Sequence, residues 1–496
     1  MAFADVVADI NEHVKGCLSS HKPDVRDAKV IHDPIHGSNL FCKEEVAVMD
    51  LPLVQRLRYV SQTDVASLIY PSCHHTRFDH SLGVAVIAGK FIDAIANTSS
   101  SKDLIGPKER LEIRLAALLH DIGHGPFSHL SELRYGEGLL TEARKAHPRR
   151  FGNAKPHEVL SYLMVTCEAF RDYFSDEIAG LSSVSSIDLD SIGNMIVGKM
   201  DDPNTNGFMG DIINGVFDAD KLDYIQRDAY FSGLRMAVDL DRILHSVWVP
   251  MNRAEGLPRH LAVRIGAVSA LEQIMFDKVQ LFSAIYHHQK VRSAECLMQS
   301  IFELLADGAS ATVNGHALSH PADFLKVTDA DILFGHTDSA RLSDYVERLK
   351  DRRLLKRALV ICPETIESPK QSGLSELNAL AEDAQGLRAL RGLIADQCSV
   401  DLMDLWIDLP LAPSLREPSQ FYVCEPGGVP RKLEAFFPTE DWLTTYSQNK
   451  LRGHVFCSSD GTTRKRVADC AAEVLREKYG IVFKPIAHKW AKHPEE

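Results

Sequence analysis

Three histidines and an aspartate lie within ten positions of the segment LLHDIGHGPFSH, residues 118–129: His120, Asp121, His124 and His129. A single buried histidine usually does no more than satisfy a hydrogen bond. Four such groups crowded together would be costly to desolvate without shared chemistry, and imidazole nitrogen with carboxylate oxygen is a frequent donor set for divalent cations. The cluster therefore predicts a metal-centred site.

The rest of the metal shell must come from elsewhere in the chain, because the adjacent residues His120 and Asp121 cannot surround an ion. His80 begins an apolar stretch and Asp220 lies in a dense polar segment, so both are suitable donors. About four protein ligands would leave positions open for water and substrate. These residues favour a His₂Asp₂ site, which suits Mg, Mn, Fe, Co, Ni or Zn.

Basic residues stand beside two of these candidate ligands, since Arg77 precedes His80 and Lys221 follows Asp220. A cation flanked by arginine, lysine and further histidines is typical of a site for phosphate esters. In such a site positive charge neutralises the phosphoryl oxygens, a water attacks and a histidine protonates the leaving oxygen. The residues thus predict a phosphohydrolase.

Helices are expected to position most of these groups. The stretch RLEIRLAALLHDI places leucines on one side and ends at the His-Asp pair, after which two glycines and a proline bend the chain. In the segment 216–234, Asp220, Tyr224 and Asp228 fall on one helical face. A salt-bridged surface helix would show the same spacing.

Two further elements are predicted around this core. Residues 29–41 alternate in polarity and turn at Asp33-Pro34, which indicates a β-hairpin or turn. Residues 269–305 have the pattern of one long helix with Tyr286 at its middle. The stretches SVWVPMN and HLAVRIG, between these segments, read as a pair of strands.

Composition sets wider limits on function. With 496 residues, 45% hydrophobic and 25% charged, the chain is typical of a large globular protein, and its formal net charge of −13 argues against a general nucleic-acid scaffold. Ten cysteines without a CxxC pair suit a reducing compartment. With no signal peptide or membrane-spanning run evident, a cytoplasmic protein with no membrane partner is expected.

The arrangement of apolar segments in the sequence changes at about residue 361. Short apolar runs (LVIC, QFYVCEP, HVFC and IVFKP) alternate with one clear helix that ends at Gly480. We therefore expect a mainly α fold with a smaller α+β lobe at the C-terminal end. The expected segments are an N-terminal helix and linker, a helical catalytic core, a helical extension and the C-terminal lobe, with bounds 1–28, 29–305, 306–360 and 361–496.

The motifs in order also carry a resemblance. DPIHG, QRLRYVSQ, HTRFDHSLGV, LLHDIGHGPFSH, PHE, DADKLDYIQRD and YHH follow one another as in the HD-domain deoxynucleoside triphosphate triphosphohydrolases. The chain is most similar to the branch with SAM and HD domains, without the SAM domain. The resemblance covers residues 29–305 well and implies an HD-domain phosphohydrolase core that cleaves a dNTP at the α-phosphorus, releasing deoxynucleoside and triphosphate.

The resemblance also implies roles for individual residues. The metal ligands would be His80, His120, Asp121 and Asp220. The catalytic group would be His124, His129, Glu132 and His157. Substrate contacts would come from Gln62, Arg77, Lys221, Tyr224, Asp228 and Tyr286. A second, activating nucleotide between subunits would bind at Lys29, Val30, His32, Asp50, Gln55, Arg58 and Arg242. A homo-oligomer, dimer or tetramer, is implied with it.

Two departures from the family pattern bear on these expectations. Asp64 places a carboxylate near the expected sugar and base, where the family has glycine, so substrate preference could differ. Downstream, Arg264 is followed by Ile265 and Ala267 in place of the family's Arg-x-Lys pair. Activation by nucleotides between subunits would therefore need a different phosphate clamp.

Three hypotheses of function remain open from the sequence. The first is a dNTP triphosphohydrolase. The second is another HD phosphohydrolase that acts on single-stranded nucleic acid or a signalling nucleotide, although the acidic net charge disfavours long polymers. The third is a nucleotide-sensing scaffold without turnover, which a complete set of ligands and catalytic histidines argues against.

Overall fold

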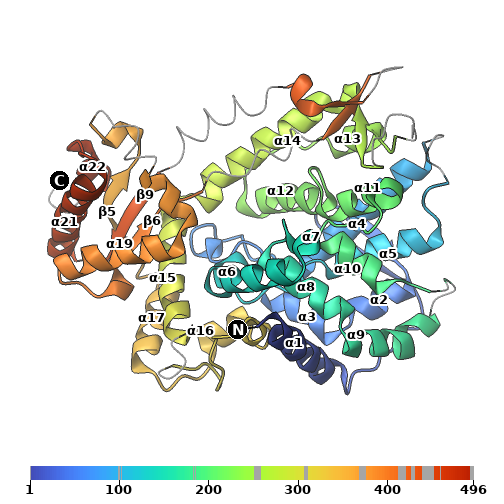
Figure 1. The fold of residues 1–496 in the computed structure, drawn as a ribbon, viewed down its shortest axis with the longest axis horizontal. Helices are drawn as coiled ribbons and strands as arrows, with labels where there is room; N and C mark the ends of the chain where they lie inside the picture. The colour runs from blue at the N-terminus through green and yellow to red at the C-terminus, as the bar shows by residue number, and fades with distance from the viewer. Residues whose placement is uncertain are drawn as a thin grey trace.

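The computed structural model describes residues 2–98, 101, 103–181, 184, 186–250, 259–306, 311–367, 376–411, 421–425, 430–437, 452–458 and 460–491. Helices dominate, and a smaller lobe with β5, β6, β9, α19, α21 and α22 lies at one side of a large helical body (Figure 1). The mainly α fold expected from the sequence is confirmed. Over these residues, none of the helices is both long and apolar enough to cross a membrane.

The large body is built from helices that follow one another through short loops. From the N-terminus they are α1 (Phe3–Leu18), α2 (Lys43–Met49), α3 (Pro52–Gln55), α4 (Arg77–Ala96), α5 (Pro107–Leu119), α6 (His129–Ala146), α7 (Pro148–Phe151), α8 (Pro156–Thr166), α9 (Glu168–Tyr173), α10 (Leu189–Ile196), α11 (Pro203–Asn214), α12 (Ala219–Ser232), α13 (Leu240–Ser246), α14 (Val268–Leu281), α15 (Gln289–Ala306), α16 (Asp329–Phe334) and α17 (Ala340–Lys350). The smaller lobe has α19 (Ala384–Gln397), α21 (Gly461–Tyr479) and α22 (Ile486–Trp490).

The strands form three small sheets. They are β1 (Lys29–Asp33), β2 (Gly37–Phe41), β3 (Val247–Trp248), β4 (Ala262–Arg264), β5 (Lys356–Ile361), β6 (Trp406–Asp408), β7 (Tyr422–Cys424), β8 (Arg431–Lys432) and β9 (Gly453–Cys457). β1 and β2 make the predicted antiparallel hairpin, and β3 pairs with β4 as expected, although Met251 and Asn252 lie outside the described residues. β5, β9 and β6 make the antiparallel sheet of the smaller lobe.

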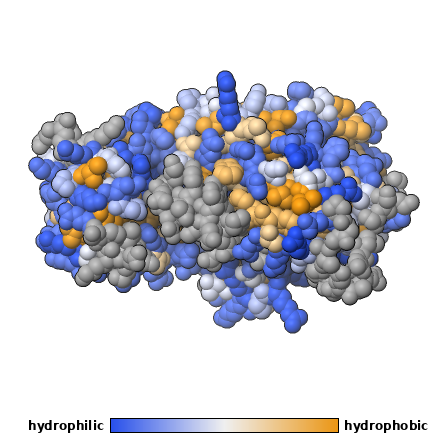
Figure 2. Space-filling view, turned by 90° about the horizontal axis from the view of Figure 1, so that it is seen from above, coloured by the Kyte–Doolittle hydropathy of each residue, from blue (hydrophilic) through white to orange (hydrophobic). Residues whose placement is uncertain are grey.

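The hydrophobic interior divides into two main cores. The larger runs from Val6 to Leu354 and also takes in Phe421, Val423 and Leu433, because β7 returns to pair in parallel with β4 of the large body. The smaller core lies between residues 358 and 487. The surface seen from above is mostly hydrophilic, with smaller hydrophobic areas between (Figure 2).

Three helices of the large body begin with strong local signals. Thr76 and Asp79 form a capping box at the start of α4, with the Asp79 carboxylate 2.9 Å from the Thr76 amide nitrogen. α5 begins with Pro107, and the Asp218 side chain caps α12 at the Lys221 amide, 2.7 Å away. Gly233, in the left-handed region at φ 77°, ends α12. These caps fix where the first turns of α4 and α12 fall.

One sequence prediction needs correction. The long helix expected over 269–305 is interrupted, because residues Phe282–Tyr286 form a π-helical turn and His287 leaves the helical conformation before α15 begins. A π turn inserts one extra residue, and no glycine or proline marks it in the sequence.

Candidate metal centre and adjoining histidine cluster

The four predicted metal ligands come from the ends of three helices. His80 lies in the first turn of α4, His120 and Asp121 directly follow α5, and Asp220 lies in the first turn of α12. The donor atoms of His80, His120 and Asp121 all lie within 4.8 Å of one another. Asp220 joins them through its Oδ1, which is 2.9 Å from His80 Nε2. His80, His120 and Asp121 are therefore close enough to share one cation, and Asp220 borders them through His80 without belonging to the mutually close group.

The donor set also fits a cation chemically. His120 Nε2 is buried and has no hydrogen-bond partner among the described residues, whereas its Nδ1 lies 2.8 Å from the carbonyl oxygen of Ala117. Burial lowers the pKa of His120, which favours the neutral ring that a metal ligand requires. Burial raises the pKa of Asp121, but His120 and Arg77 outweigh it and hold that pKa well below its usual range. The Asp220 and Asp223 carboxylates instead outweigh burial at His80 and raise its pKa to about 10, so a cation bound at that ring would displace a proton.

A buried network behind His80 orients the imidazole ring. His80 Nδ1 lies 2.7 Å from Asp223 Oδ2, which leaves Nε2 for the cluster. The Asp223 carboxylate also accepts two hydrogen bonds from Arg227, at 2.8 and 2.9 Å, and lies 2.7 Å from His36 Nε2. Arg227 is completely buried and pairs in turn with Asp33 of β1 at 2.9 Å. This network ties the β1–β2 hairpin to His80, a candidate metal ligand.

Asp223, His36 and Arg227 were not predicted from the sequence to belong to the site. A usable signal existed, because Asp223 follows Asp220 by three residues and thus lies near the same helical face. Gly83 supplies the room for the network: a Cβ there would lie 2.0 Å from Asp223 Oδ1 and 2.3 Å from an Arg227 nitrogen. Glycine is required at this crossing of α4 and α12 by close approach.

Arg77 joins the metal cluster to the loop after α5. Its guanidinium donates to Asp121 Oδ2 and to Ser128 Oγ, at 2.8 Å each, and it is 4% exposed. Ser128 in turn donates to the carbonyl oxygen of Ser61 at 2.5 Å. A buried positive charge is thus held in a fixed position beside the metal ligands.

The loop 122–128 is fastened from several sides. The Gly123 amide donates to Ser161 Oγ at 2.9 Å, and Arg56 donates to the carbonyl oxygens of Ile122 and His124. Asp329, far along the chain at the start of α16, accepts from the Phe127 amide at 2.7 Å and also from the amide and hydroxyl of Ser61, at 2.9 and 2.5 Å. Phe127 takes a positive φ of 52°. Such strain persists only where neighbouring contacts hold it.

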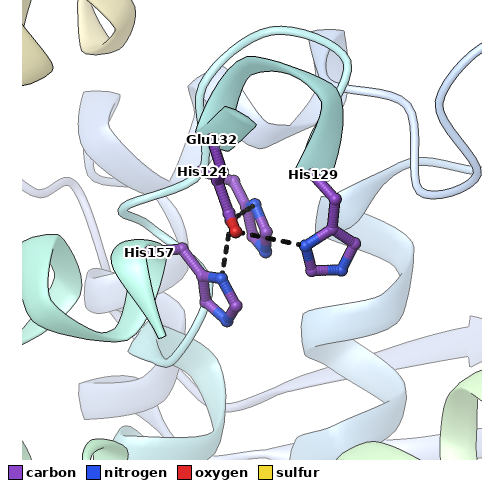
Figure 3. Close-up of side chains that lie close together, drawn as sticks. All are labelled: His124, His129, Glu132 and His157. Carbon is purple, nitrogen blue, oxygen red and sulfur yellow. Dashed lines mark hydrogen bonds and ion pairs between the residues drawn. The ribbon is translucent and has the colours of Figure 1, made fainter. Parts of the chain in front are cut away.

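The predicted catalytic residues form a second cluster around one carboxylate (Figure 3). Glu132 lies 2.7 Å from His157 Nδ1, 3.0 Å from His124 Nδ1 and 3.4 Å from His129 Nδ1. The rings of His124 and His157 stack with centroids 3.9 Å apart. His124 Nε2 lies 3.4 Å from Asp121 Oδ1, so this cluster directly adjoins the metal cluster.

The histidines of this cluster differ in their electrostatic environment. Burial, together with the positive charge of Arg77, lowers the pKa of His124 to about 3. Burial also lowers the pKa of His157, but the Glu132 carboxylate outweighs it and the net pKa is raised. The side chain of His129 is 55% exposed, unlike the other two. The Glu132 carboxylate therefore meets three different histidines: His124 is neutral, His157 favours its protonated form and His129 is accessible to solvent.

The predicted sugar contacts lie beside another buried histidine, His75. Asp228 is 2.6 Å from His75 Nε2 and accepts a hydrogen bond from the Tyr286 hydroxyl, while the Gln62 amide donates to the carbonyl oxygen of His75 at 3.1 Å. These residues are thus brought together. Tyr224 is partly buried against the large core, and Lys221 donates to Asp218 Oδ2 and to the carbonyl oxygen of Gly215, at 2.7 Å each.

The residues predicted for an activating nucleotide are partly grouped. Lys29 pairs with Asp50 at 3.6 Å, and Arg58 donates to Gln55 at 2.7 Å while its guanidinium lies over the Phe78 ring. On β1, Val30 is exposed and His32 lies 3.1 Å from Ser38 Oγ. Arg242 belongs to α13 and donates to Gly266; in the described part of the chain no hydrogen bond or ion pair links it to the others.

Comparison with known proteins agrees with this arrangement. Residues 77–227 match the HD domain and residues 238–479 match the HD-associated region. The first match begins at Arg77 and ends at Arg227, so it spans all four candidate metal ligands. The chain therefore contains an HD domain followed by an HD-associated region.

Particular relatives narrow the group to which the chain is similar. It is 31% identical over 232 residues to deoxynucleoside triphosphate triphosphohydrolase SAMHD1 of Homo sapiens, covering 44% of this chain and 35% of that protein. It is 28% identical over 309 residues to the SAMHD1 homologue of Dictyostelium discoideum, covering 62% and 54%. The chain spans about half the length of the curated relatives it matches.

One solved structure has the same overall fold. It is a phosphohydrolase from Bacteroides thetaiotaomicron, with a TM-score of 0.62 and 20% identity, which covers 87% of this chain and all of that chain. At this identity the likeness is evidence of fold alone.

Proposed function

We propose that the protein is a metal-dependent deoxynucleoside triphosphate triphosphohydrolase, which releases a deoxynucleoside and inorganic triphosphate. The observation that carries the proposal is the contact between the two clusters, where Asp121 is 3.4 Å from His124 and 2.8 Å from Arg77. Cation ligands, a fixed positive charge and proton-transferring groups thus meet at one place. The names of the SAMHD1 relatives support the choice of substrate.

His80, His120, Asp121 and Asp220 would hold a divalent cation, which neutralises phosphoryl charge and activates water when bound. The remaining chemistry falls to the chain itself. The buried guanidinium of Arg77 adds positive charge beside the same phosphate. Because that charge is fixed before substrate arrives, it needs no reorganisation during the reaction.

His129 and Glu132 are the best placed pair for moving a proton. Glu132 faces Nδ1 of His129 at 3.4 Å, which favours the tautomer with the proton on Nδ1 and leaves Nε2 free to accept one. The exposed side chain of His129 can then take a proton from an attacking water. His157, whose pKa is raised, is suited to hold a proton near the leaving oxygen.

The alternative is an HD phosphohydrolase that acts on single-stranded nucleic acid or a signalling nucleotide. Two observations favour it: Asp64 beside the site, and Arg264 followed by Ile265 and Ala267. The net charge of −13 weighs against long polymers. The triphosphohydrolase proposal also includes an activating nucleotide, bound at Lys29, Asp50 and their neighbours, and a homo-oligomer.

Incubation with each dNTP and Mn²⁺ or Mg²⁺, followed by chromatography for inorganic triphosphate and deoxynucleoside, tests the proposal. We expect release of triphosphate that His80→Ala or Asp121→Ala abolishes together with bound metal, measured by elemental analysis. His336→Ala is the matched control, because His336 is exposed and pairs only locally with Asp338. Cleavage of oligonucleotides without triphosphate from any dNTP would establish the alternative instead.

A further inference from the structure

The segment Gln62–Asp64 carries buried polar atoms that the fold does not use. Gln62 is 8% exposed, and its Oε1 has no hydrogen-bond partner among the described residues. Asp64 Oδ1 is also buried and, over the same described residues, without a partner. The backbone of Asp64 has a positive φ of 52°, which non-glycine residues adopt rarely and aspartate more readily than most. A strained residue with an unpaired buried oxygen suggests a ligand contact.

The surroundings of Asp64 place it at the candidate active site. Its carboxyl lies within electrostatic reach of Arg77 and Glu132, which belong to the two clusters described above. It also influences the titration of Tyr286, which donates to Asp228. These interactions link the Asp64 carboxyl electrostatically to both clusters and to a predicted sugar contact.

Gln62 is attached to the same region through its backbone. Its amide donates to the carbonyl oxygen of His75, whose ring lies 2.6 Å from Asp228. The preceding residue, Ser61, is held by Asp329 through two hydrogen bonds. The start of the segment is thus fixed, while Gln62 Oε1 and Asp64 Oδ1 have no partner in the part of the chain that the structure describes. Rigid placement of unpaired acceptors is what recognition of a small ligand requires.

We propose that Asp64 determines which nucleotide the site prefers, by pairing with a hydrogen-bond donor on the nucleoside part of the substrate. This inference rests on the proposed function. The donor is a ring N–H or an exocyclic amine of the base, or a hydroxyl of the sugar, because the unused atoms on the protein side are oxygens. A site built to pair such a group discriminates against analogues that lack it.

The state of the Asp64 carboxyl supports a paired contact. Burial, and the negative charge of Glu295, raise its pKa well above the usual range. A carboxyl that keeps its proton can donate through one oxygen and accept through the other, as the amide of asparagine does. Asparagine should therefore preserve selectivity, whereas glycine should remove it without opposing the positive φ.

The experiment compares kcat/KM of the full chain for the four dNTPs, for dITP, which lacks the 2-amino group of dGTP, and for 3′-deoxy analogues. We expect Asp64→Gly to reduce the preference for the favoured nucleotide by about tenfold and Asp64→Asn to keep it within about threefold. A change confined to the dGTP and dITP pair assigns the contact to the base. A change confined to the 3′-deoxy analogues assigns it to the sugar.

Asp277→Asn is the matched control, since Asp277 of α14 is another buried carboxyl with one unpaired oxygen, but its pKa responds only to burial and to Gln273. The Asp277→Asn variant should have the same nucleotide preferences as the wild type. Equal preferences in Asp64→Gly and wild type, within about twofold for every nucleotide, would overturn the inference.

Failure of the proposed function gives a different result, namely no triphosphate from wild type with any dNTP. In that case the rise in melting temperature on adding each of the same nucleotides reports selectivity without turnover. Loss of differences between nucleotides in Asp64→Gly, but not in Asp277→Asn, would then support the inference. Identical shifts in wild type and Asp64→Gly would overturn it.

Discussion

Replacing Gly83 by alanine tests whether the buried network behind His80 governs metal binding. The added Cβ would lie 2.0 Å from Asp223 Oδ1 and 2.3 Å from an Arg227 nitrogen, distances that no carbon can keep. Both side chains are fully buried, so neither can swing into solvent. Either α4 and α12 must move apart or the ion pair must break.

The expected magnitude follows from those two outcomes. Breaking a buried ion pair costs about 3–5 kcal/mol, and overpacking that the helices relieve by moving costs about 1–3 kcal/mol. We therefore expect Gly83→Ala to lower the free energy of unfolding by about 3 kcal/mol. Because His80 Nδ1 loses its fixed partner, Mn²⁺ affinity should fall about 10–100-fold.

Urea unfolding followed by circular dichroism, and calorimetric titration with Mn²⁺, measure the two effects. Gly138→Ala in α6 is the matched control, because no atom lies within 4 Å of its added Cβ. Alanine there should stabilise the exposed helix by about 0.5–1 kcal/mol and leave metal affinity unchanged. Wild-type stability and Mn²⁺ affinity in Gly83→Ala would refute the role of the network.

Three further outcomes test other contacts. Burial raises the pKa of Asp329 to about 6, so between about pH 4 and 6 the folded state keeps a proton that the unfolded state has lost. The contribution of Asp329 to the free energy of unfolding should therefore fall over that range, and a urea series should show the wild type losing stability relative to Asp329→Asn as the pH rises from about 4 to 6. Arg391→Ala removes two hydrogen bonds to the buried Glu303 carboxylate, at 3.0 and 2.9 Å. The free energy of unfolding, measured by the same urea assay, should fall by about 2–3 kcal/mol, and a fall of less than about 1 kcal/mol would contradict the expectation. Tyr286→Phe removes the hydrogen bond from the Tyr286 hydroxyl to Asp228. It should lower kcat/KM for dNTPs about tenfold and leave the circular dichroism spectrum unchanged. A variant with the kcat/KM of the wild type would exclude a role of this hydroxyl in substrate binding.

The centre of the site was accessible from the sequence because its chemistry is locally concentrated. His120 and Asp121 are adjacent, and the dense polar segment around Asp220 stands out in an otherwise apolar helix. The capping signals at Thr76 and Asp218 likewise explain why the first turns of α4 and α12 begin where they do. Residues whose type is unusual for their surroundings can be found without a structure.

The supporting contacts were not accessible in the same way, because they join distant parts of the chain. Asp329 binds Ser61 across 268 residues, and its own segment carries no pattern that indicates a site. The reason for Gly83 appears only when α4 and α12 cross. The π turn before His287 has no marker residue either, so periodicity alone extended the helix through it.

The Asp329 contact has a consequence for exchanging parts between related proteins. Chimaeras joined after residue 305 would take Ser61 and Phe127 from one parent and residue 329 from the other. If the second parent lacks an acidic side chain there, the backbone amides of Ser61 and Phe127, beside the candidate site, lose their acceptor. Residue 329 would have to come from the same parent as these two, so residues up to 305 cannot be exchanged as a unit without it.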